Sequence, residues 1–165
     1  MKINKLNFII LFVLLFYFFF NYILFLNSEG LKSFLMGADS YSYYNPAFNL
    51  FNEGKLIFSD GNYMNNNTPL YSLLIYSFFY LSLSNAYILV IICQSILLLI
   101  SSFIFISTFK FINKNLKIIL FILIIFNPNL LISAHLCQTE ILYTFFFITS
   151  FYYLIKISEK FKIKY

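Results

Sequence analysis

The first long apolar run of the chain, residues 8–26, reads FIILFVLLFYFFFNYILFL. It contains no charged residue, and a transmembrane helix needs roughly 20 predominantly apolar residues. Lys2 and Lys5 precede the run, and no small-residue cleavage site follows it. These features predict an uncleaved anchor helix whose N-terminus faces the cytoplasm. A cleaved signal peptide is the weaker alternative.

The composition of the whole chain is typical of a membrane protein. Of its 165 residues, 61% are hydrophobic and 10% are charged, and the mean hydropathy is +0.83. A soluble domain does not accommodate such a composition, because much of its surface has to stay in water. The net charge of +5 comes from lysines at the ends of apolar runs. Such lysines are topology signals, so we expect no nucleic acid partner.

Three further apolar runs, residues 86–109, 118–133 and 141–155, have the character of membrane spans. Residues 69–83, PLYSLLIYSFFYLSL, form a shorter run that is more typical of a re-entrant or interfacial segment. Residues 27–68 form one long polar loop, and the chain has no internal repeat or linker. We therefore expect an all-α, multi-pass transmembrane helix bundle that forms a single membrane domain over residues 1–165.

The positions of the lysines predict which ends of this bundle share a compartment. Lysines cluster before residue 8, within residues 110–117 and after residue 155. Because lysine-rich ends face the cytoplasm, the loop 27–68 and the region around Glu140 should lie together on the outer face. This topology requires that residues 69–83 do not cross the membrane. The expected location is the cytoplasmic (inner) membrane of the cell.

The polar loop contains a pattern that predicts a short helix. Five residues recur at intervals of 4, 4, 3 and 4, which is one face of an α-helix: Asp39, Tyr43, Ala47, Leu50 and Gly54. An Asp at the start and a Gly at the end are favourable helix caps. We expect a juxtamembrane helix on the outer surface. Pro46 leaves open a kink, or a helix start at Asn45.

Two acidic residues are candidate functional groups. Asp39 has an alternative role as a helix N-cap, and caps are commoner than catalysts. Glu140 opens an apolar run in AHLCQTEILYTFFF, where an acid is costly and usually has a partner or a function. A solvated acid at a helix start explains Glu140 equally well.

Other polar side chains carry weaker signals. Most tyrosines fit an interfacial aromatic belt, although rings such as Tyr43 are also able to stack against a sugar. Cys93 and Cys137 lack the spacing of metal ligands and are interpreted as small core residues. No metal site is indicated.

The order of these segments resembles the polytopic glycosyltransferases of the GT-C fold. After the first span come DSYSYYNPAFNLFNEGKL (39–56), NNTPLYSLLIYSFFYL (66–81), a lysine-ended span, and NPNLLISAHLCQTEILYTF (127–145). The chain is most similar to the family 39 glycosyltransferases, the bacterial relatives of protein O-mannosyltransferases and aminoarabinose transferases. Their first outer loop carries an acid followed by Tyr, Ala, Leu and Gly at the same spacing. The resemblance covers nearly the whole chain and corresponds to the N-terminal part of these longer enzymes.

The resemblance implies a transferase that takes a sugar from a polyprenyl-phosphate carrier on the outer face and transfers it, with inversion, to a glycolipid or protein acceptor. Asp39 matches the acid that acts as general base on the acceptor, and Glu140 matches a second outer-face acid of the substrate site. Tyr43 and Lys55 are the other expected substrate-binding residues. No cofactor is implied, a divalent cation is left open, and a second chain would supply the further helices of the family.

Three other interpretations also fit the sequence. The first is a non-catalytic small membrane subunit of a larger partner. The second is a fragment of a lipid-linked-sugar polymerase or flippase, and the third is an inactive gene remnant. Substitution of Asp39 by Asn separates the first of these from the transferase, because assembly with a partner does not need that carboxylate.

Overall fold

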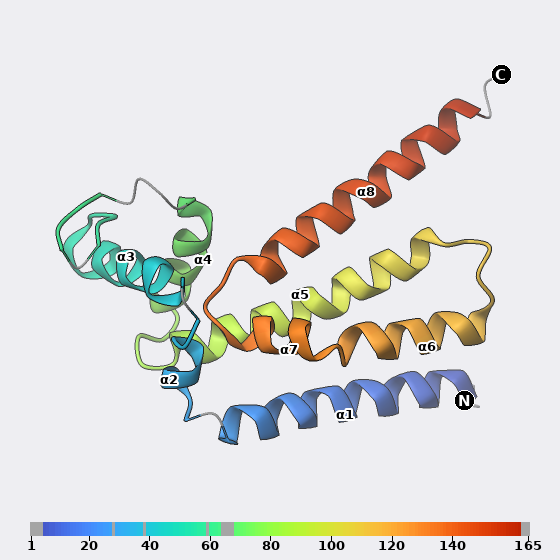
Figure 1. Cartoon of the computed structure of the whole chain (residues 1–165), viewed down its shortest axis with the longest axis horizontal. Coiled ribbons are helices and arrows are strands. Elements are labelled where there is room, and N and C mark those ends of the chain that lie inside the picture. The colour runs from blue at the N-terminus through green and yellow to red at the C-terminus, as the bar shows by residue number, and fades with distance from the viewer. Residues whose placement is uncertain (1–4, 28, 38, 59, 64–67, 163–165) are drawn as a thin grey trace.

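The computed structural model describes residues 5–27, 29–37, 39–58, 60–63 and 68–162, and its elements in these ranges are all helices (Figure 1). In chain order they are α1 (Lys5–Asn27), α2 (Leu31–Phe34), α3 (Ser40–Glu53), α4 (Pro69–Phe79), α5 (Ala86–Thr108), α6 (Lys114–Ile125), α7 (Pro128–His135) and α8 (Glu140–Lys162). The predicted all-α class is confirmed.

Three of the helices, α1, α5 and α8, are long and apolar enough to cross a membrane. The pair α6 and α7 passes the same test together, although it is bent by 48°. In the apolar window of α5, 44% of the residues are buried, against 11% in α1 and 6% in α8. Helix α5 is therefore the central helix of the bundle, and the outer helices turn most of their apolar surface outward, as expected in lipid.

The predicted apolar run 118–133 is two helices and not one. Helix α6 ends at Ile125, and Asn127 caps the start of α7, where its Oδ1 accepts bonds from the backbone N–H of Asn129 (3.0 Å) and Leu130 (3.3 Å). Pro128 cannot continue a preceding helix, but it is well suited to the first turn of a new one. The Asn-Pro pair is thus the cause of the bend.

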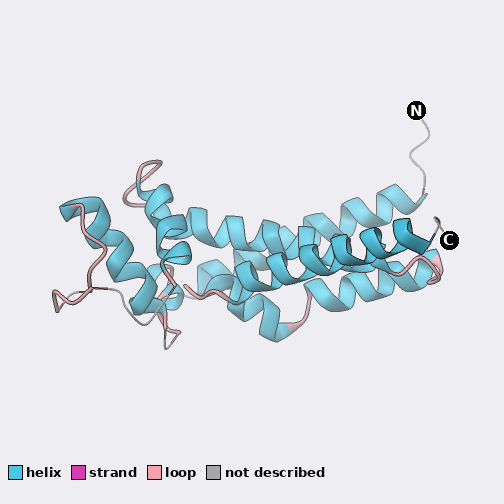
Figure 2. Ribbon diagram, turned by 90° about the horizontal axis from the view of Figure 1, so that it is seen from above, coloured by secondary structure: helices cyan, strands magenta, loops and turns pink. Residues whose placement is uncertain are grey.

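The bundle has two distinct ends (Figures 1 and 2). The start of α1, the α5–α6 connection and the end of α8 lie at one end, which we call the lysine end. Lys110 and Glu159 form an ion pair there. Helices α2, α3 and α4 lie at the opposite end with the α7–α8 connection, and we call this the loop end. This arrangement is the one that the lysine positions require, while the orientation in a membrane stays a prediction.

The helix expected in the polar loop is present as α3. It ends at Gly54, which has a φ of 71° and whose N–H donates to Leu50 O (3.1 Å). Helix α3 begins at Ser40 and not at Asn45, and Pro46 lies buried within it. The short apolar segment after it forms α4, which has Pro69 in its first turn. The hydroxyl of Ser72 in α4 donates to the backbone carbonyl of Tyr43 (2.9 Å), which fixes α4 against α3.

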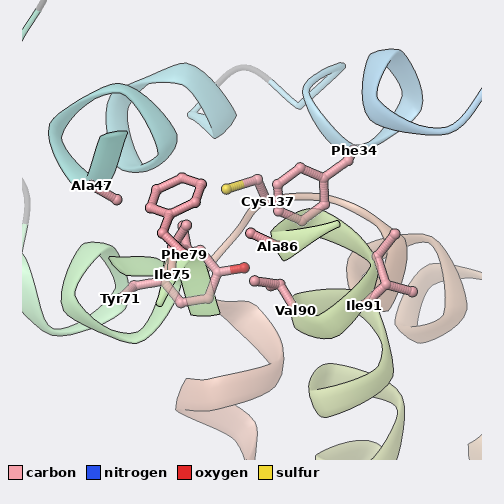
Figure 3. Close-up of a cluster of buried hydrophobic side chains, with 9 residues drawn as sticks. All are labelled: Phe34, Ala47, Tyr71, Ile75, Phe79, Ala86, Val90, Ile91 and Cys137. Carbon is pink, nitrogen blue, oxygen red and sulfur yellow. The ribbon is translucent and has the colours of Figure 1, made fainter. Parts of the chain in front are cut away.

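A hydrophobic cluster holds the loop end together (Figure 3). It joins α2, α3, α4, the start of α5 and the α7–α8 connection, and it consists of Phe34, Ala47, Tyr71, Ile75, Phe79, Ala86, Val90, Ile91 and Cys137. Because these residues come from five separate segments, the loop end is a packed layer on top of the bundle and not a set of independent loops.

Candidate functional site

The segment after α2 lies directly against the α7–α8 connection. The N–H of Cys137 donates to the backbone carbonyl of Phe34 (2.8 Å). A Cβ atom at Gly37 would lie 2.4 Å from Gln138 Nε2 and 2.6 Å from Ser40 Oγ, so a larger residue there would displace these two side chains. Gly37 thus leaves room for the close approach of the Gln138 side chain. We call these segments, 34–37 with 39–40 and 136–140, the docked junction.

The two predicted acids lie on the two sides of the docked junction. Asp39 is exposed at the position before α3, and its carboxylate makes no cap hydrogen bond there. Glu140 is exposed in the first turn of α8. The structure therefore brings together the segments that carry Asp39 and Glu140, although 100 residues of sequence separate the two acids. The Asp39 carboxylate therefore does not form the N-cap hydrogen bond to α3 that was its alternative role.

Gln94 is the polar side chain that fixes the docked junction to the bundle. It is fully buried in α5, and its Nε2 donates to the carbonyls of Leu136 (3.1 Å) and Ser133 (3.2 Å). Its Oε1 accepts a hydrogen bond from the Tyr71 hydroxyl (3.1 Å). One amide thus joins α4, α5 and α7 in an apolar surrounding, where an unmade hydrogen bond is costly.

The next residue of α5 extends this polar layer towards α1. The Ser95 carbonyl accepts a bond from the Tyr17 hydroxyl (3.4 Å), and Ser95 Oγ donates to Asn21 Oδ1 (3.5 Å). Gln94 and Ser95 were not among the residues predicted for the site. The available signal was Gln94, the one amide side chain in the run 86–109, followed by Ser95, since polar residues at membrane depth usually join helices or serve function.

A pocket of about 250 Å³ opens beside Glu140, between the first turns of α4 and α8. Most of its lining is apolar or aromatic, and two threonine hydroxyls are the exception: it is lined by Thr68, Leu70, Tyr71, Thr139, Leu142, Tyr143 and Phe146. Such a pocket suits a hydrocarbon chain that ends in a polar group.

The two other predicted substrate-binding residues lie elsewhere. Tyr43 is half-buried and packs edge-to-face against Tyr71, with 5.3 Å between ring centroids. Lys55 is exposed just beyond Gly54, at the far end of α3 from Asp39. Because a helix of 14 residues is about 21 Å long, Lys55 is not brought to the two acids. The lysine nearest in sequence to the docked junction is Lys32, whose Nζ pairs with Glu29 at 3.0 Å.

Burial raises the pKa of Cys137 in the docked junction and of Tyr44 in the neighbouring helix α3. It raises the pKa of the Cys137 thiol well above its ordinary value, and a hydrogen bond with Tyr71 offsets only part of this rise. Burial, and to a lesser extent the neighbouring Cys137, also raise the pKa of Tyr44. Both groups therefore stay neutral near pH 7 and act as packing residues. Within the described ranges, no three His, Cys, Asp or Glu side chains gather in a group that holds a metal ion.

Comparison with known proteins gave no match. No family model matches the chain, no curated protein is similar to it in sequence, and no solved structure is similar to it in fold.

Proposed function

We propose that the chain forms the N-terminal part of a membrane glycosyltransferase that moves a sugar from a polyprenyl phosphate to a glycolipid or protein acceptor. One observation carries the proposal. The segments of Asp39 and Glu140 are held together by the 2.8 Å hydrogen bond between Cys137 and Phe34. Two exposed carboxylates on touching segments supply a base for the acceptor and a second polar group that orients the sugar.

The proposed reaction is a single displacement at the anomeric carbon. The Asp39 carboxylate takes the proton of the acceptor hydroxyl or amine as the acceptor atom bonds to that carbon. The bond from the carbon to the phosphate oxygen breaks at the same time, and polyprenyl phosphate leaves with the electron pair. Because attack comes from the side opposite the leaving group, the configuration inverts. The reaction needs no oxidant or reductant.

The pocket beside Glu140 supports the lipid part of this proposal. Its volume of about 250 Å³ and its apolar walls fit a section of prenyl chain. Thr68 and Thr139 line the same pocket and offer hydroxyl donors for the phosphate. A donor held there would present its sugar to the Glu140 side of the docked junction.

The test is sugar transfer by native membrane vesicles that contain the chain, with radiolabelled sugars on polyprenyl phosphate as donors. Asp39→Asn should lower the transfer rate roughly a hundred-fold or more, which is the usual loss on removing a positioned base. Asp60→Asn is the matched control, because Asp60 is an exposed acid of the same loop whose carboxylate binds Asn62. Transfer by Asp39→Asn at the rate of the unmodified chain contradicts the proposal.

A second candidate function is that of a non-catalytic subunit in a larger membrane complex. The observation that favours it is that only 6% of the residues in the apolar window of α8 are buried, so the face of α8 that is turned away from α5 is exposed to helices of another chain. In this case Asp39→Asn leaves the complex intact, while substitutions on the exposed face of α8, such as Phe147→Ala, release the partner. Co-purification of the complex from membranes distinguishes the two functions.

A further inference from the structure

A second pocket lies at the lysine end, far from the docked junction. It has a volume of about 170 Å³ and lies between α1, α5 and α6. Six of its lining side chains are apolar and two are lysines: Ile10, Val13, Phe103, Ile106, Ile118, Phe121, Lys114 and Lys117. A cavity of roughly 150 Å³ with apolar walls is large enough to hold benzene. The pocket therefore has room for a section of one acyl chain.

The two lysines lie three residues apart on α6 and so share one face of that helix. Side chains of a helix tilt towards its N-terminus, and the N-terminus of α6 lies at the lysine end (Figure 1). The ammonium groups are therefore directed towards the membrane surface, and the apolar walls extend below them. This order of charge above hydrocarbon matches a phospholipid.

The charges around this pocket favour an anion. Among the described residues, neither Lys114 nor Lys117 forms an ion pair. Glu159 at the same end is engaged by Lys110. The start of α6 does not need a ligand for itself, because Asn113 Oδ1 already accepts the N–H of Leu116 (2.8 Å). The unpaired charge thus resides on the lysine side chains, where it is available to a phosphate.

We propose that this pocket binds one anionic phospholipid, with an acyl chain between α1, α5 and α6 and the headgroup phosphate on Lys114 and Lys117. The site is independent of sugar transfer. Basic pockets between membrane helices commonly hold anionic headgroups. The occupant is a membrane lipid and not free phosphate, because most of the lining is apolar and contacts only the hydrocarbon part.

The test is native mass spectrometry of the purified chain with phosphatidylglycerol and with phosphatidylcholine of the same acyl chains. The unmodified chain should retain one phosphatidylglycerol more tightly than phosphatidylcholine. Each lysine near a headgroup adds roughly five-fold to affinity, so Lys114→Gln together with Lys117→Gln should lower phosphatidylglycerol binding about 25-fold. Lys160→Gln is the matched control, because Lys160 is exposed on α8 and does not line the pocket.

Two further measurements keep the test decisive. Lys114→Arg with Lys117→Arg preserves both charges and should retain the lipid, which separates loss of charge from loss of folding. Glycerol phosphate, which is a headgroup without acyl chains, should not displace the bound lipid. An unchanged preference for phosphatidylglycerol in the double Gln variant overturns the proposal. Equal loss in Lys160→Gln, or displacement by glycerol phosphate, also overturns it.

Discussion

Replacing Gln94 by Leu should separate the docked junction from the bundle. Leu is close to Gln in volume, so the substitution removes the amide without opening a large cavity. It removes three hydrogen bonds of 3.1–3.2 Å, to Tyr71, Leu136 and Ser133. At about 0.6 kcal/mol for each bond between membrane helices, and with a further 1–3 kcal/mol for a polar group left buried and unsatisfied, we expect a loss of about 3–5 kcal/mol in the free energy of unfolding.

The assay is reversible unfolding of the chain in mixed micelles, with a double-mutant cycle to Tyr71→Phe. Removal of both partners should cost less than the sum of the two single losses, by about 0.6 kcal/mol or more. Ser107→Ala on the same helix is the control, because the Ser107 hydroxyl is exposed and donates to Ile104 O within its own helix. Additive losses, or a Gln94→Leu variant as stable as the Ser107→Ala control, refute the assignment of Gln94 as the residue that holds the junction.

The docked junction and the lysine end give four further predictions. In a Cys93→Ser background, Cys137 should resist maleimide at pH 8 until the chain unfolds, because the thiol is buried and its pKa is raised; rapid labelling of the native chain contradicts this. Because the folded state holds that proton more tightly, stability should fall as the pH rises above the ordinary thiol pKa of 9.0, as unfolding curves between pH 8 and pH 10 will test. Gly37→Ala should cost about 1–3 kcal/mol through the clash with Gln138 and Ser40, and an unchanged unfolding midpoint contradicts it. Glu159→Gln should change stability by less than about 1 kcal/mol, because its ion pair with Lys110 is solvent-accessible; a larger shift in the midpoint is the opposite result.

Most of the helices could be predicted from the sequence, because apolar runs and capping residues are local signals. Gly54 and the spacing of residues 39–54 predicted α3 within a residue at each end. The break between α6 and α7 also has a local sequence signal, the Asn127-Pro128 pair. The sequence analysis predicted one continuous span there, because the segments on both sides of the pair are apolar.

The arrangement of the candidate site could be predicted only in part from the sequence. Asp39 was singled out by its place in the spacing of residues 39–54, Glu140 by its place at the start of an apolar run, and both by the resemblance. The lysine positions predicted that the two acids share one face. Their segments meet through contacts of Cys137 and Gln138 with residues about 100 positions earlier, and no local pattern encodes such pairings. Lys55 was grouped with Asp39 because both lie in one loop, whereas α3 keeps the two apart.

The most direct test of the account is the sidedness of three single cysteines in sealed, oriented membrane vesicles. In a background without Cys93 and Cys137, the substitutions Asp39→Cys, Glu140→Cys and Lys114→Cys are labelled with a membrane-impermeant maleimide. The account predicts that positions 39 and 140 react from one side of the membrane and position 114 from the other. Labelling of positions 39 and 140 from opposite sides would contradict a shared site for the two acids.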